Sequence, residues 1–558
     1  MHDYFSGIGL DIGAGADPLS VYGRFFPAIQ QLIAWNAESR DAVHMDGAPS
    51  HVFDFVHSDC LGRFSNPHQA LARWLEIVKP GGYLVLTLPT HVASPGECIF
   101  TLSRSRAAPP HEVNAFDLVM EASAVATCER VCVVREADEN RPPGVTAATR
   151  ETGALAIEVV VRKCDVPELH ALLSAIDTAD SETAVLERCR EALRLYPYRC
   201  DTYLCVNMAM LRWGFSRKLE GVWAAAVRRL PHEHLPKLFH ALMLIALGML
   251  NKGFKRREAL FAGTVWQRRT SVPPPAYADW RGESLEGKSI VIWSEFGLGD
   301  EIFFFRFARM FSERSGAASV TVVCQTPLVE LFRAAGSGAT ICGVKDARQL
   351  PPHDYWVYPH AIPAWAPLDI DHLPDVVPYL RADPAHAPIA LPGNPHALKV
   401  GVVFKGAPTH ENDAARSLPS LDCLAPLFAL DGVEFHVMQK GQGEGEAAEY
   451  AARVPNVHDL APSIHSFGDT ARMLAALDLL ISVDTSTANL AGAMGRPVWL
   501  MLPMLCDWRW HLDRDDSPWY PSVRLFRERG EGWSEVVLRI RAALEQRLAV
   551  RYIMGGAA

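Results

Sequence analysis

The stretch ISVDTSTANLAGAMGRPVWLML, residues 481–502, combines two patterns. Apolar residues run up to Val483 and resume after Pro497, which predicts two strands, since strands covered on both faces are almost continuously apolar. Between them lie an acidic residue, three hydroxyl residues and a run rich in alanine and glycine, which predict a turn and a closely packed helix. A strand, turn, helix and strand in this order are typical of a parallel α/β sheet.

The same alternation extends through the C-terminal half of the chain. Apolar runs predict strands at 289–293, 320–324, 339–343 and 355–358, and again at 399–404, 433–438, 479–483 and 497–502. The proline-rich segment DPAHAPIALPGNPHALK separates the two sets and predicts a linker. We therefore predict two half-size α/β domains, 280–385 and 395–548, each with a Rossmann-like sheet and with a cleft between them. This arrangement is similar to the GT-B architecture of glycosyltransferases.

The loop after the strand at 289–293 carries a candidate general base. In an open parallel sheet a ligand lies beyond the carboxyl ends of the strands, so the residues that follow each strand are the informative ones. The loop SEFGLGD places Asp300 at the start of a helix. The helix dipole lowers the pKa of a carboxylate in that position, which suits a base that must be ionised at pH 7. The alternative is that Asp300 only caps the helix.

Three other loops indicate an anion site. Lysine and arginine follow the strands at 399–404 and 433–438, and such cations suit a diphosphate, although solvated surface charges are the alternative. After the strand at 479–483, hydroxyl groups and backbone N–H groups lie at a helix start, where the dipole favours a phosphate, with a purely structural cap as the alternative. The residues predicted to hold a nucleotide sugar are Lys405, Arg416, Lys440, Asp484, Thr485, Ser486 and Thr487.

Together with Asn489-Leu490-Ala491-Gly492 and DWRWHLDRDDSPWYPSVRLFR, these loops resemble the bacterial glycosyltransferases of the heptosyltransferase type (family 9), in the branch fused to tetratricopeptide repeats. The resemblance implies an inverting enzyme in which Asp300 removes the proton of the acceptor hydroxyl and Asp484-Thr485 contacts the donor. Asn489 stands where the family commonly has a histidine, so its contacts with the donor are expected to differ.

Two features of the DWRWHLDRDDSPWY segment allow more than one interpretation. Asp513-Arg514-Asp515 imitates the metal-binding DxD motif of GT-A enzymes, but the surrounding order is not that of GT-A, and we predict no metal. The aromatic residues form either a stacking wall for the base or sugar, or part of the core. These residues are Trp508, Trp510, Trp519 and Tyr520.

Residues 1–165 also alternate strands and helices. After the strand-like start IGLDIGAGADPL, the pattern predicts a strand at 53–57, a helix at 67–78, a turn at 79–82 and a strand at 83–88. This order resembles the class I S-adenosylmethionine-dependent methyltransferases and implies a Rossmann-like methyltransferase fold.

The methyltransferase resemblance also implies a cofactor site. Glycines in the first turn let the backbone approach S-adenosylmethionine, and an acid after the second strand binds the ribose hydroxyls, for which Asn36, Glu38 and Asp41 are the candidates. The predicted S-adenosylmethionine site consists of Asp11, Gly13, Gly15 and Asp41.

Strand patterns are absent from residues 168–270. A shift of 34 residues aligns Pro197 with Pro231 and Gly214 with Gly248, which is the period of a tetratricopeptide helix pair. We predict a helical, tetratricopeptide-like region outside both C-terminal sheets, which either spaces the domains or docks a protein acceptor. The apolar run 238–250 is too short to span a bilayer and predicts a buried helix.

Composition narrows the class of protein. The net charge of −10 disfavours nucleic acid as a partner, and twelve cysteines without CxxC spacing favour free thiols in a reducing cytoplasm. No transmembrane segment is predicted. The sequence therefore predicts a cytoplasmic glycosyltransferase that moves a sugar from a nucleotide-sugar donor to a protein or glycan acceptor. The alternatives are a methyltransferase whose C-terminal half only binds glycan or protein, and a non-enzymatic repeat scaffold.

Overall fold

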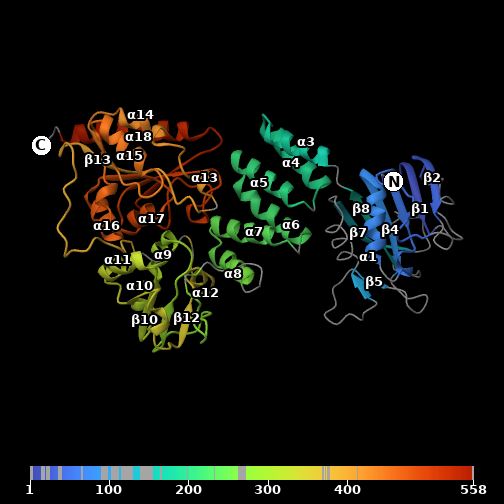
Figure 1. Ribbon diagram of the computed structural model, residues 1–558, viewed down its shortest axis with the longest axis horizontal. Coiled ribbons are helices and arrows are strands. Elements are labelled where there is room, and N and C mark those ends of the chain that lie inside the picture. The colour runs from blue at the N-terminus through green and yellow to red at the C-terminus, as the bar shows by residue number, and fades with distance from the viewer. Residues whose placement is uncertain are drawn as a thin grey trace. The chain divides into compact units, whose positions relative to one another are not determined.

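The computed structural model divides the chain into two compact units (Figure 1). Residues 1–209 and 228–230 belong to the first, and residues 210–227 and 231–558 to the second. The division falls within helices α5 (Cys200–Arg212) and α6 (Leu219–Arg229). The structure describes residues 4–13, 19, 26–35, 41–64, 67–89, 99–101, 112–114, 130–138, 155–163, 166–197, 199–230, 233–261, 270, 272–366, 368, 370, 373, 377–410 and 412–555.

The first unit is built on a six-stranded sheet with the strand order β2-β1-β3-β4-β8-β7. Its strands are β1 (Gly7–Ile12), β2 (Ile29–Trp35), β3 (Phe53–Ser58), β4 (Val78–Pro89), β7 (Arg130–Asp138) and β8 (Leu155–Lys163). β1 to β4 pair in parallel, whereas β8 runs antiparallel to both of its neighbours. β5 (Ile99–Thr101) and β6 (Glu112–Asn114) form a separate parallel pair. Helix α1 (Pro67–Ile77) buries Trp74 in the core of this unit.

The predicted elements of this unit are largely confirmed. The strand at 53–57 and the helix at 67–78 correspond to β3 and α1, but the turn predicted at 79–82 is wrong, because these residues lie inside β4. The pairing of β4 with β3 shifts register across them, so they form an irregularity in the ladder and not a loop. Glycine is required there, because a Cβ on Gly82 would lie 2.6 Å from the carbonyl oxygen of Asp54.

Six helices follow the first sheet and carry the predicted 34-residue period. They are α3 (Val166–Asp177), α4 (Glu182–Leu195), α5, α6, α7 (His234–Ala246) and α8 (Leu250–Phe261). α7 spans the positions that lie 34 residues after those of α5. Gly214 and Gly248, two residues beyond these helices, have φ values of 74° and 86°, which favour glycine. The period therefore recurs in the local structure and not only in the letters.

The apolar run 238–250 lies in α7 and at the start of α8. Leu244 and Ile245 are fully buried, as the prediction of a buried helix requires. None of the helices formed by the described residues combines the length and apolar character that a membrane crossing needs.

The second unit contains two parallel sheets (Figure 1). The first has the order β11-β10-β9-β12, and its strands are β9 (Ser289–Ile292), β10 (Ser319–Cys324), β11 (Thr340–Gly343) and β12 (Tyr355–Val357). The second has the order β15-β14-β13-β16-β17-β18, and its strands are β13 (Leu398–Val403), β14 (Val433–Val437), β15 (Val457–Asp459), β16 (Leu479–Val483), β17 (Val498–Leu502) and β18 (Val523–Arg527). All strand pairs in both sheets are parallel.

Helices flank both of these sheets. Those that accompany the first are α9 (Leu298–Phe304), α10 (Arg306–Arg314), α11 (Val329–Ala335) and α12 (Ile362–Trp365). Those that accompany the second are α13 (Asp413–Arg416), α14 (Ala425–Phe428), α15 (Glu444–Arg453), α16 (Phe467–Ala476), α17 (Ser486–Ala493) and α18 (Trp533–Gly555).

The α/β class with parallel sheets is confirmed, and each of the eight predicted C-terminal strands is present within one residue at either end. The sequence prediction missed β15 and β18. β15 is only three residues long and ends in histidine and aspartate. β18 has the sequence VRLFR, in which two arginines interrupt the apolar pattern, and both strands lie at edges of the sheet. Short or polar edge strands leave little apolar pattern to detect.

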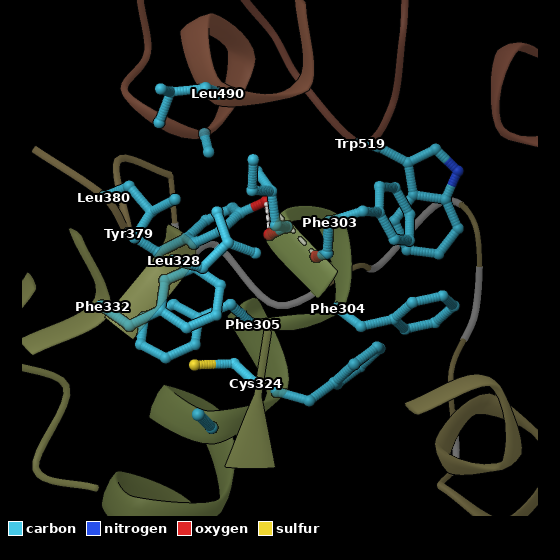
Figure 2. Packing of buried hydrophobic residues seen from close by; sticks show 14 of the residues in the cluster. Phe303, Phe304, Phe305, Cys324, Leu328, Phe332, Tyr379, Leu380, Leu490 and Trp519 are labelled. Carbon is cyan, nitrogen blue, oxygen red and sulfur yellow. Dashed lines mark hydrogen bonds between the residues drawn. The ribbon is translucent and has the colours of Figure 1, made fainter. Parts of the chain in front are cut away.

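One hydrophobic core joins the two sheets of the second unit (Figure 2). The Phe303 ring of α9 lies 5.0 Å from that of Trp519 and 5.6 Å from that of Trp508, measured between centroids. Trp510, Trp519 and Tyr520 are at most 2% exposed. Of the two roles predicted for these aromatic residues, packing is the one observed, although Trp508 also lines the cavity at the sheet ends.

Helices α7 and α8 belong to this core as well. Ile245, Leu250 and Phe254 are buried among residues of both sheets. The Nδ1 of His511 donates a hydrogen bond to the carbonyl oxygen of Ala246 at 2.8 Å. α7 and α8 belong to neither sheet, but their apolar faces pack into the core that the two sheets share.

Candidate active site

A cavity of about 1400 Å³ lies in the second unit along the carboxyl ends of strands from both parallel sheets. This is where an open α/β sheet binds its ligand. The loops that line it follow strands of both sheets, and they include Gly297–Asp300 after β9, Thr326 after β10, Lys345 after β11, Lys405 after β13, Lys440 after β14, His465 after β15, Asp484 after β16 and Arg509 after β17. Phe239, Leu242 and Met243 of α7 form part of the same lining.

The loop predicted to hold the base and the loop predicted to hold the donor meet in this cavity. A Cβ built on Gly299 would lie 3.5 Å from the Nδ2 of Asn489 and 3.6 Å from the Cα of Ser486. The N-terminal ends of α9 and α17 are therefore in van der Waals contact, with glycine at the closest point. Two loops that are far apart in sequence form one wall.

Asp300 is a helix cap, one of the two roles that the sequence left open, and it also lines the cavity. Its Oδ2 accepts a hydrogen bond from the backbone N–H of Gly297 at 3.0 Å, which is a cap of α9, and its Oδ1 pairs with the guanidinium of Arg509. Burial acts to raise the pKa of Asp300, but the charges of Arg509 and His360 outweigh it and the pKa is lowered. The carboxylate is thus ionised at pH 7 while it lines the cavity.

Arg509 is a residue of this site that the sequence interpretation missed. It lies in the short turn η10 (Trp508–Trp510), pairs with the Oδ1 of Asp507 at 2.9 Å and is 6% exposed. Burial opposes its charge, but the neighbouring carboxylates of Asp507, Asp300 and Asp484 raise the pKa of Arg509. A guanidinium between three carboxylates at the edge of a cavity is a cation that an incoming anion can recruit.

The position of Arg509 carried a signal in the sequence. It follows β17, just as Lys405 follows β13 and Lys440 follows β14, so the same rule of strand ends would have selected it. The prediction considered only the aspartates and the aromatic residues of that segment.

Asp484 is half-buried and close to Asp507. Burial and the charge of Asp507 raise the pKa of Asp484 to about 6, against the opposing effect of Trp510, Arg509 and Arg416. An acid with such a pKa changes charge near neutral pH. The charge of the Asp484 carboxylate can therefore control how readily the cavity binds an anionic ligand.

The residues after Asp484 divide into a cap, a lining and a support. The Oγ1 of Thr485 accepts the backbone N–H of Ala488 at 3.3 Å, so the predicted structural cap is present, while Ser486 and Thr487 line the cavity. The Nδ2 of Asn489 donates to the carbonyl oxygen of Thr485 at 3.0 Å, and its Oδ1 accepts from Tyr520. Asn489 is 4% exposed and holds the loop in place, and because it also lines the cavity its contact with the donor stays a prediction.

The three predicted cations all line the cavity but differ in their partners. The Nζ of Lys405 lies 2.5 Å from the Oε1 of Glu446, which neutralises most of its charge. The Nζ of Lys440 is 3.4 Å from Glu444, with a side chain that is 48% exposed.

Arg416 lies across the end of β13 and is paired with Asp413 at 3.5 Å. A Cβ on Gly406 would lie 2.6 Å from the Nη2 of Arg416, so the glycine makes room for this guanidinium. Both residues line the cavity.

The predicted S-adenosylmethionine residues lie in the first unit. The Oδ2 of Asp11 accepts the backbone N–H of Leu19 at 2.7 Å, and its Oδ1 lies 2.8 Å from the Nδ1 of His57. Gly13 has a φ of 83°, and a Cβ there would lie 2.5 Å from the Sγ of Cys60, so only glycine fits. Asp41 is exposed and accepts two backbone N–H groups of its own turn.

Three further candidates of the first unit, Gly15, Asn36 and Glu38, lie outside the described residues. Asp41 binds within its own turn, and its pKa is lowered by hydrogen bonds from His44 and Val43. The described residues thus show a glycine turn after β1, and the binding of S-adenosylmethionine there stays a prediction.

The two aspartates of the Asp513-Arg514-Asp515 motif have partners other than each other. Asp513 accepts a hydrogen bond from Ser216, and Asp515 lies 3.9 Å from Arg529 with its side chain 74% exposed. Among the described residues, no three or more histidine, cysteine, aspartate or glutamate side chains are grouped so as to hold a metal ion.

Comparisons with known proteins give distant likenesses. No family model matches the chain. The protein FlbA of Caulobacter vibrioides is 28% identical over 333 residues, which are 54% of this chain and 54% of FlbA, so the chain spans about half the length of the curated relative it matches.

Among solved structures, the E. coli ADP-heptose LPS heptosyltransferase II is 12% identical, with a TM-score of 0.31, over 47% of this chain and 99% of that enzyme. A mutant O-GlcNAc transferase of Thermobaculum terrenum is 14% identical, with a TM-score of 0.26, over 69% of this chain and 92% of that chain. Likenesses at these values do not identify a family, so the residues of the cavity carry the case for a function.

Proposed function

We propose that this protein is an inverting, metal-independent glycosyltransferase that moves a sugar from a nucleotide-sugar donor to a hydroxyl of a protein or glycan acceptor. The observation that carries the proposal is the position of Asp300. This ionised carboxylate lines a cavity of about 1400 Å³, next to the N-terminal end of α17 and the buried cation Arg509. A base, an anion-binding helix end and a cation are the groups that such a transfer needs.

The donor diphosphate would lie between the loops of the second sheet. The backbone N–H groups at the start of α17 and the hydroxyls of Ser486 and Thr487 would bind its oxygens, with Arg416 and Lys440 supplying charge. Arg509 would exchange its contact with Asp300 for a contact with the diphosphate. This exchange would free the Oδ1 of Asp300 when the donor is bound.

In the reaction, Asp300 would remove the proton of the acceptor hydroxyl as that oxygen attacks the anomeric carbon. The bond between the anomeric carbon and the phosphate oxygen breaks, and the nucleotide departs with the electron pair. The cationic side chains and the helix end then stabilise the charge that develops on the leaving phosphate. The segments 280–385 and 395–548 would act as the acceptor and donor halves.

The apolar lining from α7 supports a role for the helical region at the acceptor end. Phe239, Leu242 and Met243 reach the same cavity as Asp300. Deletion of 168–270 cannot test this role, because it would remove core residues such as Phe254. Substitution of the lining residues is the suitable experiment.

A panel of nucleotide sugars that differ in the base tests the proposal. We expect calorimetry to detect binding of one base class, and we expect slow release of the nucleotide with water as the acceptor. If the folded protein binds no member of the panel, the proposal is wrong. S-adenosylmethionine belongs in the same panel: the glycine turn at Gly13 supports a methyltransferase as the second candidate function, and failure to bind would remove it.

A further inference from the structure

A buried acidic residue and a histidine lie directly behind Asp300. His360 is in the short turn η6 (Pro359–Ala361) after β12, and Glu295 is in the loop after β9. Glu295 is fully buried and His360 is 3% exposed. The sequence offered Glu295 only as a substitute base for Asp300 and did not single out His360, and neither residue lines the cavity.

Glu295 fixes the orientation of His360. Its Oε2 accepts the backbone N–H of His360 at 3.2 Å and lies 3.0 Å from the Nδ1 of the ring. Because a carboxylate can only accept, the ring nitrogen at this contact carries the proton. The rings of Phe304 and Phe296, with centroids 4.3 Å and 4.8 Å away, hold the imidazole from the side.

The other ring nitrogen faces the candidate base. The Nε2 of His360 lies 3.7 Å from the Oδ1 of Asp300. This distance is too long for a hydrogen bond. At this separation the two atoms share no hydrogen, and with the ring proton on Nδ1 the lone pair of Nε2 faces the carboxylate. Once Asp300 gains a proton, its O–H can donate to Nε2.

We propose that His360 accepts the proton that Asp300 takes from the acceptor hydroxyl, and that Glu295 is the positioning residue that keeps Nε2 free for it. This inference rests on the proposed glycosyl transfer. The acceptor oxygen loses its proton to Asp300, the proton passes to Nε2, and the resulting imidazolium lies between two carboxylates. After the nucleotide leaves, the proton returns through Asp300 to solvent.

The charges around His360 agree with this role. Four charged groups face it or its partner oxygen: Glu295, Asp300, Arg257 of α8 and, through Asp300, Arg509. Burial and Arg257 lower the pKa of His360, while Glu295 and Asp300 act in the opposite direction. The ring is therefore mainly neutral at pH 7 and can accept a proton. It loses this ability as the pH falls through its pKa.

The test is the pH dependence of kcat at a saturating concentration of the nucleotide sugar that the panel selects, with nucleotide release as the readout. We expect kcat of the wild type to fall on the acid side as His360 becomes protonated. His360→Gln should lower kcat by about tenfold and remove this acid limb, while the affinity for the nucleotide sugar stays unchanged. Because kcat is measured at a saturating concentration of the nucleotide sugar, a change in donor affinity caused by the titration of Asp484 does not affect it.

Glu295→Gln gives an independent readout. The change removes a charge that raises the pKa of His360, so the acid limb should move to lower pH. His353→Gln is the matched control, because His353 belongs to the same half, is hydrogen-bonded to Thr321 and does not line the cavity. Its profile should coincide with that of the wild type.

Two results separate the possible failures. If both variants lose rate while their acid limbs stay at the wild-type pH, His360 and Glu295 have only a structural role and this inference is wrong. If the wild type binds no nucleotide sugar, the proposed glycosyl transfer fails and the inference fails with it. A His360→Gln variant with the full wild-type rate would also overturn the inference.

Discussion

Each unit pairs an aspartate in or after its first parallel strand, β1 or β9, with a histidine in or after a neighbouring strand, β3 or β12, but the two pairs differ in how they are bonded. In the first unit, Asp11 and His57 are in direct contact at 2.8 Å, and the second oxygen of Asp11 is used by a backbone N–H. In the second unit, Asp300 and His360 are 3.7 Å apart, and Asp300 lines a cavity. We infer that the pair in direct contact has a structural role, whereas the pair held apart can exchange a proton.

Of the substitutions that distinguish the Asp300–His360 pair from the Asp11–His57 pair, we expect the largest effect, a loss of turnover, from Asp300→Asn. The amide keeps the shape of the side chain but cannot take a proton, so turnover should fall by roughly 100-fold or more with little change in nucleotide-sugar affinity. Single-turnover kinetics and calorimetry provide the two measurements. Near wild-type turnover would reduce Asp300 to a helix cap, and the base would then have to be sought at Glu301 or Glu295.

Asp11→Ala should affect stability. The change leaves the backbone N–H of Leu19 and the Nδ1 of His57 without their acceptor, and we expect a loss of about 3 kcal/mol in the free energy of unfolding of the first unit. Chemical denaturation measures it. Asp41→Asn, at an exposed turn, is the control and should shift the midpoint little. An unchanged midpoint for Asp11→Ala would contradict a structural role for the pair of Asp11 and His57.

Arg509→Gln tests whether the cation beside Asp300 is available to the donor. Because the guanidinium would have to turn toward the diphosphate, its loss should weaken nucleotide-sugar binding by about tenfold. Arg333→Gln is a matched control, since Arg333 is an exposed arginine on the wall from the first sheet. Equal affinities for the wild type and Arg509→Gln would mean that Arg509 serves Asp300 alone.

The smallest effect concerns Asp484 and pH. Its pKa is raised to about 6, so the carboxyl is mainly ionised at pH 7 and becomes protonated as the pH falls through 6. Loss of that negative charge should strengthen nucleotide-sugar binding a few-fold between pH 7 and pH 5. Asp484→Asn should bind with little dependence on pH over this range. Calorimetry at both pH values decides, and a pH-dependent Asp484→Asn would assign the effect to another group.

The two pairs also show what a sequence can and cannot predict. The strand ends were predictable, because long apolar runs such as 479–483 mark buried parallel strands; Asp484 follows that run directly, and Asp300 lies at the end of the loop after β9. The partners were not, because Arg509 lies 209 residues from Asp300 and Glu446 lies 41 residues from Lys405. Only the packed fold brings such residues together.

The sequence likewise did not indicate a role for His360. It follows the short strand β12, and nothing in its neighbourhood of the sequence distinguishes it from an ordinary core histidine. Its importance comes from two residues that are distant in sequence: Glu295, which lies 65 residues away, and Asp300 at the start of α9. Conversely, the 34-residue helix period was readable because each glycine that ends a helix is a local requirement.

The shared core of the second unit limits how its cleft can move. Buried Arg306 donates to the carbonyl oxygen of Trp519 at 3.1 Å and to the hydroxyl of Tyr379 at 3.3 Å, and Phe303 packs on Trp519 (Figure 2). A hinge motion that separated the two sheets would break these contacts and expose aromatic surface to water. A ligand of this cavity would therefore have to enter through rearrangement of side chains and loops, with the two sheets held at a nearly constant separation. Solution scattering should accordingly give the same radius of gyration with and without a nucleotide sugar, and a marked contraction would show that the core yields.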